Sequence, residues 1–262
     1  MNKYETGFKQ RTWFMAAVLA ALMGGCGGDE IFGTAGSGGA LGPGGGPGAG
    51  SCASGALPLG SAASFGVLAG SALTVTNPTS VTGNVGAPSI TPAAGPSTLV
   101  GTLYDSTPAS ELTVISTAVT DMRNSIACGV ARPCDFNYLA GHDFGGDTLL
   151  PGVHCVPGAM SVGSNLTLSN PGVYIFRATG ALTSAASITV AFGGTANAAN
   201  SSVFWVSSGV ASGAVIGATN VFLGTIMVDP AAATLGANTT LLPGRVLSGS
   251  AVTLSTNTIA IP

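Results

Sequence analysis

The C-terminal part of the chain repeats one pattern of apolar and polar positions. Three segments that begin at Gly213, Ala232 and Ala251 align at equal spacing, and a fourth that begins at Gly180 aligns after a longer interval. Apolar residues recur in fixed columns of this alignment, and Gly or Pro residues separate the copies. A repeat of about 20 residues with these features predicts a β-solenoid, in which stacked coils bury a continuous core.

Short runs rich in β-branched and aromatic residues predict two or three strands in each coil. In the C-terminal part these runs are residues 204–206, 225–228 and 245–247. Weaker copies of the same pattern precede the middle of the chain, at residues 71–77, 80–85 and 98–103. We therefore expect coils both before and after the middle.

The middle of the chain has a helical period instead. Apolar residues are spaced by three and four positions, which places them in one stripe along a helix; they are Leu112, Ile115, Val119, Met122 and Ile126. Thr107 is a suitable N-cap, Pro108 suits the first helical position, and Gly129 is a typical stop. The pattern predicts a helix over about residues 108–128, with its apolar stripe against the side of the solenoid.

Residues 1–26 are typical of a signal peptide. Basic residues precede an apolar run, residues 13–23, that is too short to cross a bilayer. Residues 23–26 resemble a bacterial lipobox, which makes Cys26 the candidate lipidation site. The alternative is ordinary secretion with cleavage nearby. Residues 27–56 are rich in Gly, Ser, Ala and Pro and predict a flexible tether before a folded domain at 57–262.

Charge and hydropathy restrict the function classes. Only 6% of the residues are charged and no basic run follows the signal peptide, so nothing attracts nucleic acid. The hydrophobic fraction is 46% and the mean hydropathy is +0.53, which excludes a disordered chain. We expect a secreted protein or a lipoprotein of the outer membrane or cell surface, whose one membrane contact is the lipid anchor.

Four cysteines remain once Cys26 is set aside. An even number in an exported chain predicts disulfides, and four cysteines allow three pairings. We favour Cys134–Cys155 and Cys52–Cys128. No zinc-finger spacing accompanies them, so we expect no metal.

Catalytic chemistry has little support in the sequence. His142, Asp143, Asp147 and His154 lie in a Gly-rich connecting region without a signature spacing, and a solvated loop is the simpler interpretation. Neither a nucleophile elbow nor a phosphate-binding loop is found. We predict that the protein is not an enzyme and needs no cofactor.

Over roughly residues 58–262, coils are followed by a long helix and then by further coils, and seven segments have a characteristic sequence: residues 59–70, 149–153, 171–176, 203–205, 223–226, 252–254 and 257–259. In this order of elements and in these segments the chain resembles the microbial ice-binding protein family. The resemblance implies a mostly β fold: a right-handed discontinuous β-solenoid with one long α-helix packed alongside. It also implies an antifreeze function, with ice as the partner of a monomer.

Some family members carry a motif, Thr-Ala/Gly-any-Thr/Asn, on strands that face ice. The stretches that correspond here are residues 184–187, 217–220, 236–239 and 255–258. Their first position is Ser or Gly instead of Thr, a departure that bears on the strength of the activity rather than on the fold. With neighbouring Thr residues they supply the candidate ice-binding residues: Ser184, Ser187, Thr219, Asn220, Thr234, Asn238, Thr239, Thr253, Ser255, Asn257 and Thr258.

Ice offers an ordered array of water and no charge, so a binder needs an ordered array of its own. Short hydroxyl and amide side chains on stacked strands can hold such waters at little entropic cost. The same residues have a structural interpretation, because a column such as Asn220, Thr239 and Thr258 can satisfy backbone groups at a corner. A cell-surface adhesin or structural solenoid therefore remains an alternative function, and glycan binding, which needs exposed aromatics, is a third.

Overall fold

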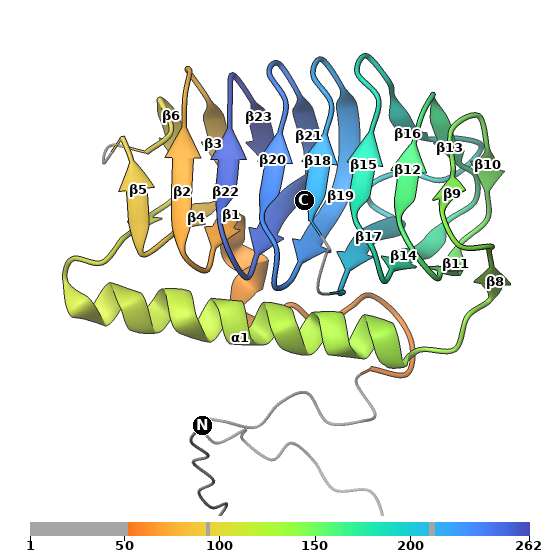
Figure 1. Ribbon diagram of the computed structural model, residues 1–262, viewed down its shortest axis with the longest axis horizontal. Coiled ribbons are helices and arrows are strands. Elements are labelled where there is room, and N and C mark those ends of the chain that lie inside the picture. The colour runs from red at the N-terminus through yellow and green to blue at the C-terminus, as the bar shows by residue number, and fades with distance from the viewer. Residues whose placement is uncertain (1–51, 93–94, 210–212) are drawn as a thin grey trace, which may run out of the picture. The chain divides into compact units, whose positions relative to one another are not determined.

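The computed structural model describes residues 52–92, 95–209 and 213–262, and these fold as a solenoid of parallel strands. The predicted signal peptide, the lipidation site Cys26 and the tether as far as residue 51 lie outside the described residues. The mostly β fold with one α-helix is confirmed. Figure 1 shows the coils side by side, with the helix running across them below the strands of the front sheet.

Three sheets form the sides of the coils. The eight-stranded sheet, in front in Figure 1, has the order β5 (Ser89–Thr91), β2 (Ala72–Val75), β22 (Val252–Leu254), β20 (Ala233–Leu235), β18 (Ala214–Ile216), β15 (Leu182–Ser184), β12 (Met160–Val162) and β9 (His142–Asp143). The three-stranded sheet contains β10 (Thr148–Leu149), β13 (Leu166–Leu168) and β16 (Val190–Phe192).

The twelve-stranded sheet has a main path and a side branch. Along the path lie β6 (Thr98–Val100), β3 (Ser80–Thr82), β23 (Thr258–Ala260), β21 (Thr240–Ser248), β19 (Val221–Val228), β17 (Ser201–Ser207), β14 (Gly172–Ala178), β11 (Gly152–Val156) and β8 (Phe136–Asn137). The branch contains β1 (Phe65–Ala69), β4 (Asn84–Gly86) and β7 (Leu103–Tyr104), with β1 paired to β21.

The N-terminal coils stack on the last coil of the chain. Strand β2 pairs with β22, so that Thr74 faces Thr253 in register, and β1 pairs with β21. The chain then follows helix α1 (Ala109–Ala131) to the far end of the stack, where β8 and β9 begin the return. The long helix thus links two coils that are adjacent in sequence and far apart in the stack.

The register of the repeat differs from the prediction in two places. Ala214 pairs with Ala233 and Ala233 with Val252, which confirms the equal spacing of the last three copies there. Leu182, however, pairs with Ala214, whereas the predicted alignment set it against Val215. Successive strand residues point to opposite faces, so this single-residue correction exchanges inward and outward positions in the coil of β15.

The second difference lies in the last coil. Strand β21 pairs with β23 through Thr240 and Thr258, whereas the predicted alignment set Thr239 against Thr258. The corner of this coil is therefore one residue shorter than those before it. In space Thr239 is followed by Asn257, not by Thr258.

The predicted helix is present but its ends differ. Pro108 is the N-cap instead of the first helical residue, and no side chain caps this end. Gly129 does not stop the helix, which continues to Ala131. The glycine instead allows α1 to pack closely on the residues before β1, because a Cβ at this position would lie 3.2 Å from Leu57. Leu112, expected in the apolar stripe, is exposed.

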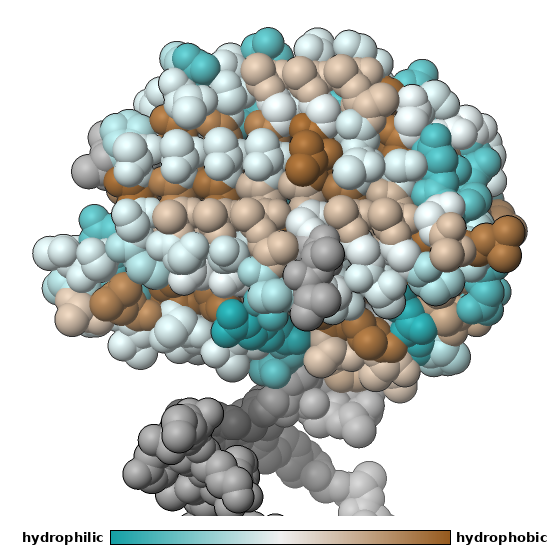
Figure 2. Space-filling view, viewed as in Figure 1, coloured by the Kyte–Doolittle hydropathy of each residue, from teal (hydrophilic) through white to brown (hydrophobic). Residues whose placement is uncertain are grey.

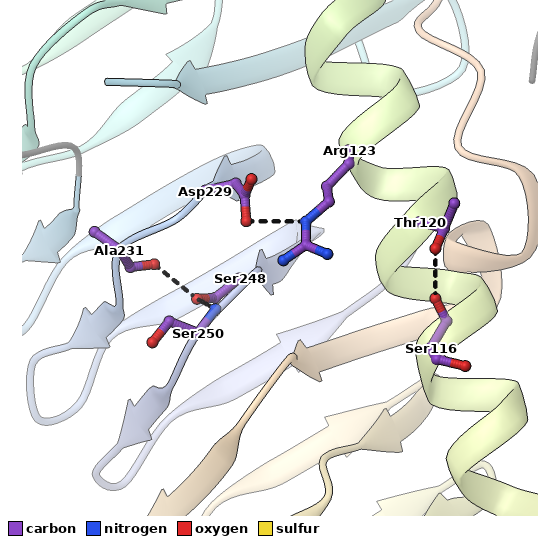
Figure 3. A network of polar contacts seen from close by, with 7 residues as sticks. All are labelled: Ser116, Thr120, Arg123, Asp229, Ala231, Ser248 and Ser250. Atoms are coloured by element: carbon purple, nitrogen blue, oxygen red, sulfur yellow. Dashed lines mark hydrogen bonds and ion pairs between the residues drawn. The ribbon is translucent and has the colours of Figure 1, made fainter. Parts of the chain in front are cut away.

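The buried side of α1 packs on the outer face of the twelve-stranded sheet and on the residues before β1. Ile115, Val119, Met122 and Ile126 form one cluster with sheet residues Leu68, Ile175, Met227 and Leu247. At its edge Arg123 Nε donates to Asp229 Oδ1 at 3.1 Å (Figure 3). Beside this pair, Ser248 Oγ donates to the carbonyl of Ala231 and accepts from the backbone N–H of Ser250.

Both predicted disulfides are present, Cys134–Cys155 and Cys52–Cys128. The second ties the start of the described chain to α1. Arg132 adds to this link, since its guanidinium donates to the carbonyl oxygens of Cys52, Ser54 and Gly55. Residues 52–56 are thus held against the domain, ahead of the boundary predicted at residue 57.

Candidate functional site

One column of side chains points outward along the middle of the eight-stranded sheet. In four strands of this sheet, β12, β18, β20 and β22, the outer two residues are buried and the central one reaches solvent. Backbone pairing aligns these central residues with one residue of each remaining strand, from Thr91 in β5 to Asp143 in β9. We call this set the column face: Thr91, Thr74, Thr253, Thr234, Val215, Thr183, Ser161 and Asp143.

The column face is an array of short side chains at strand spacing. Neighbouring strands lie about 4.7–4.9 Å apart, so hydroxyl and methyl groups recur at that interval. Next to the column lie small residues, among them Ala232, Ala251, Ala181 and Ala159, whose carbonyls accept the hydrogen bonds of the neighbouring coil. Pale rows of residues cross this face in Figure 2. Val215, which is 54% exposed, is the one aliphatic member, and Asp143 at the end is the one charged member.

Of the predicted ice-binding residues, Thr234 and Thr253 lie in the column face. Four hydroxyl residues of the column were missed by the prediction: Thr74, Thr91, Ser161 and Thr183. For Thr74, Ser161 and Thr183 the signal was a Ser or Thr between two residues that point inward, as in Leu73-Thr74-Val75. Thr91 has no such signal, because the exposed Pro92 follows it. The predicted alignment obscured it for Thr183, because it set Thr183 against the buried Ile216.

Three other candidates are buried, and the expectation that they reach a ligand is corrected. Asn220, Thr239 and Asn257 are 1%, 1% and 2% exposed. They line up at the corner after the eight-stranded sheet and bond to backbone groups of the preceding coil. Thr239 Oγ1 donates to the carbonyl of Gly217, and Asn257 Nδ2 donates to that of Gly236, both at 2.8 Å. Backbone groups at a corner have no strand partner, so a buried side chain must satisfy them.

Two serines support the same corners from partly buried positions. Ser184 Oγ accepts from the backbone N–H of Gly217 at 2.9 Å and from Asn220 Nδ2. Ser255 donates its backbone N–H to Asn257 Oδ1, and its hydroxyl accepts from Asn77 Nδ2 at 3.0 Å. Their polar atoms are therefore engaged within the fold.

Ser187, Thr219 and Asn238 are exposed at the tips of the corners. Each has a positive φ, near 60°, and Thr256 in the last coil has the same conformation at 52°. Backbone hydrogen bonds join the tips, as from Ser187 N to Ala218 O at 2.9 Å. They form the rim of the column face rather than part of it.

Thr258 lies beyond the corner, on the twelve-stranded sheet. It is exposed and pairs with Thr240 on one side and Ser80 on the other. Its side chain therefore belongs to a different side of the solenoid from Thr234 and Thr253.

The acidic and histidine residues singled out from the sequence do not form the solvated loop that was expected, since His142 and Asp143 lie in β9 and His154 lies in β11. Asp143 Oδ1 accepts from the backbone N–H groups of Gly145 and Gly163, and these bonds lower the pKa of its carboxyl. His154 is fully buried inside the solenoid. Its pKa is lowered because burial disfavours the charged ring. Within the described residues no group of three or more His, Cys, Asp or Glu could hold a metal ion.

Comparison with known proteins places this geometry in a family. A model of the family described as "Ice-binding-like" matches residues 67–260. The chain belongs to the ice-binding-like family. An ice-binding protein of Flavobacterium frigoris is 32% identical over 182 residues, which is 64% of either chain. One from Nostoc is 30% identical over 175 residues, 64% of this chain and 61% of its own length.

Solved structures of the family share the fold. An ice-binding protein from the Antarctic ascomycete Antarctomyces psychrotrophicus superimposes with a TM-score of 0.66 at 26% identity, over 79% of this chain and 98% of its own. An ice-binding protein domain from Shewanella frigidimarina gives 0.67 at 25% identity, over 80% and 99%. The chain thus spans somewhat less than two thirds of the curated relatives and nearly all of these solved domains. Among the described residues no helix is long and apolar enough to cross a membrane.

Proposed function

We propose that this chain is an exported ice-binding protein that adsorbs to ice through the column face and inhibits ice growth or recrystallisation. The observation that carries the proposal is the register of hydroxyl residues in the eight-stranded sheet. Thr74 faces Thr253, Thr253 faces Thr234, and Thr183 faces Ser161 across successive strands.

The chemistry of this face suits ordered water. A threonine supplies a hydroxyl that can hydrogen-bond a water and a methyl that leaves a neighbouring gap, and it has few rotamers to lose. The backbone beneath it is fixed on both sides by parallel strand pairing and below by the buried core. A rigid array meets ice without an ordering penalty, and its many weak contacts act together. The proposed activity needs no catalytic group and no cofactor.

The architecture and location are part of the same proposal. We infer that the solenoid is right-handed, since parallel strands joined by crossovers almost always wind that way. It is discontinuous in that its first coils stack on its last. We also infer that the chain acts as a monomer, secreted or anchored at the outer membrane or cell surface through lipid on Cys26. The tether would then hold the column face away from the membrane.

The experiment is an ice recrystallisation assay on the purified protein and two tyrosine variants. Thr234→Tyr places a bulky ring in the middle of the column face and should abolish most of the inhibition without unfolding the protein. Thr113→Tyr places the same ring on the exposed side of α1 and should leave inhibition unchanged. A folded wild type without activity at micromolar concentration would contradict ice binding and favour the adhesin or structural solenoid. Equal activity of both variants would contradict the column face as the site.

A further inference from the structure

A pocket of about 260 Å³ lies on the outer side of the twelve-stranded sheet and shares no residue with the column face. Parts of the chain that are distant in sequence meet there: the residues before β1, the end of β16, the start of β17, the middle of β19, the middle of β21 around Pro243, and Pro262. Its walls are mainly apolar, from Leu57, Phe192, Val203, Leu223 and Pro243. The volume is close to the lower end of small-molecule sites, about 300 Å³.

Arg245 is the unusual residue of this pocket. Its side chain is buried, with 6% of the residue exposed, and its Nε has no hydrogen-bond partner among the described residues. No ion pair to a carboxylate of the described chain is formed either. The other three arginines of the described chain are engaged: Arg132 and Arg177 donate to backbone carbonyls, and Arg123 pairs with Asp229.

Fold requirements do not account for a guanidinium at this position. The neighbours of Arg245 across the sheet are Thr225 on β19 and, beyond it, Phe204 on β17. A buried cation without a partner is costly, and arginine cannot escape the cost by losing its proton at physiological pH. Burial lowers the pKa of Arg245, in keeping with a charge that lacks compensation.

The pocket supplies what an anion with an apolar body would contact. The guanidinium fork matches the two oxygens of a carboxylate, and a neighbouring hydroxyl is present on Thr225. Ser201 and Ser202 stand at the start of β17 in the same lining. No Asp or Glu is among the lining residues, so no acidic side chain of the pocket competes for Arg245. The apolar walls favour a short aliphatic or aromatic body over a hydrated inorganic anion.

We propose that this pocket binds a small monocarboxylate with an apolar body, with its carboxylate on Arg245 and its body between Leu57, Val203 and Leu223. The site is independent of ice adsorption, because the column face lies on another sheet. A bound carboxylate would compensate the buried charge and stabilise the fold by mass action.

The experiment is a titration of the purified protein with benzoate, and with neutral benzamide as the matched ligand. Benzoate should raise the melting temperature in a concentration-dependent way and shift the amide resonances of residues 201–203 and 223–225. Benzamide should do neither. Arg245→Met keeps the length and removes the charge, so it should bind benzoate roughly tenfold more weakly or worse. Arg123→Gln, which removes an arginine outside the pocket, should bind like the wild type.

Each alternative outcome is decisive. No benzoate binding by folded wild type at millimolar concentration would overturn the proposal, as would equal binding by Arg245→Met. Equal binding of benzamide would show that the pocket recognises the ring without the carboxylate, and would also overturn it. If Arg245→Met does not fold, the localised amide shifts of the wild type decide the question. Ice recrystallisation inhibition should be unchanged by benzoate, which separates this result from the test of ice binding.

Discussion

Asn220 and Ser184 form a side-chain hydrogen bond of 2.7 Å from Nδ2 to Oγ across two successive coils. The same amide also donates to the carbonyl of Ala185 at 2.8 Å, and its oxygen accepts from the backbone N–H of Ile188. Asn220 therefore satisfies three groups at the corner where the backbone leaves the eight-stranded sheet. Polar residues of this kind hold the shape that keeps the column face in register.

We expect Asn220→Ala to destabilise the protein by about 1–3 kcal/mol, because it leaves a buried N–H and a carbonyl without partners. Chemical denaturation measures this directly. Thr258→Ala, at an exposed position beyond the corner, is the control and should change stability by less than about 0.5 kcal/mol. Equal effects of the two substitutions would mean that the corner bonds contribute nothing.

Val215→Thr should increase ice activity. Val215 lies between Thr183 and Thr234 in the column face and has the same shape as threonine, so the substitution adds a hydroxyl where the column lacks one. The site is exposed, and the hydroxyl has no burial penalty to overcome. The measurement is the lowest protein concentration that stops recrystallisation, together with the melting temperature, which should stay unchanged. Unchanged or weaker inhibition would argue against the column as the contact surface.

The corner tips provide a matched pair of substitutions. Thr219 and Asn238 occupy equivalent positions with φ of 61° and 60°. In this left-handed conformation a β-branched residue has a conformational energy roughly 1 kcal/mol higher than that of asparagine. We therefore expect Thr219→Asn to raise the free energy of unfolding and Asn238→Thr to lower it by a similar amount. Changes of the same sign in both variants would contradict this explanation.

Mild acid should destabilise the fold through His154. Its Nε2 lies 3.0 Å from the carbonyl of Leu150 and so donates to it, which leaves Nδ1 as the acceptor for the hydroxyl of Tyr138 at 2.8 Å. The neutral ring is thus the form that the fold selects, between the rings of Phe136 and Phe176. The pKa of His154 is lowered in the folded state, chiefly by burial. The contribution of the neutral ring to the free energy of unfolding is therefore fully present above the pKa of histidine in the unfolded chain, about 6.5. It is lost progressively as the pH falls below that value towards the folded pKa.

The check is the free energy of unfolding of wild type and His154→Phe between pH 7 and pH 5. The phenylalanine can stack in the same column of rings but cannot take up a proton. The wild type should lose more stability over this interval than the variant. Parallel losses would place the acid sensitivity in other groups. Asp143 is not a competing cause in this window, because its carboxyl, with a lowered pKa, is protonated only at lower pH.

Much of the architecture was predictable because its signals are local or strictly periodic. The apolar stripe from Ile115 to Ile126 predicted α1, and the equally spaced C-terminal copies predicted the stacking of β18, β20 and β22. The disulfide between Cys134 and Cys155 joins residues close in sequence. These features depend on spacing along the chain, which is visible without the fold.

The assignment of polar residues to the surface required the tertiary structure. Thr234 and Thr239 are close in sequence and chemically identical, yet one is in the column face and the other is buried beneath a corner. The shorter last coil and the pairing of Leu182 with Ala214 each move the register by one position. In a strand, one position exchanges the two faces.

By itself, then, the sequence determined a solenoid, its flanking helix and the abundance of short hydroxyl side chains. The tertiary structure decided which hydroxyls reach solvent, because that depends on strand pairing between coils, some of them distant in sequence. Thr74 and Thr253 illustrate the point: they adjoin only because the first coil stacks on the last, a contact that no local pattern encodes.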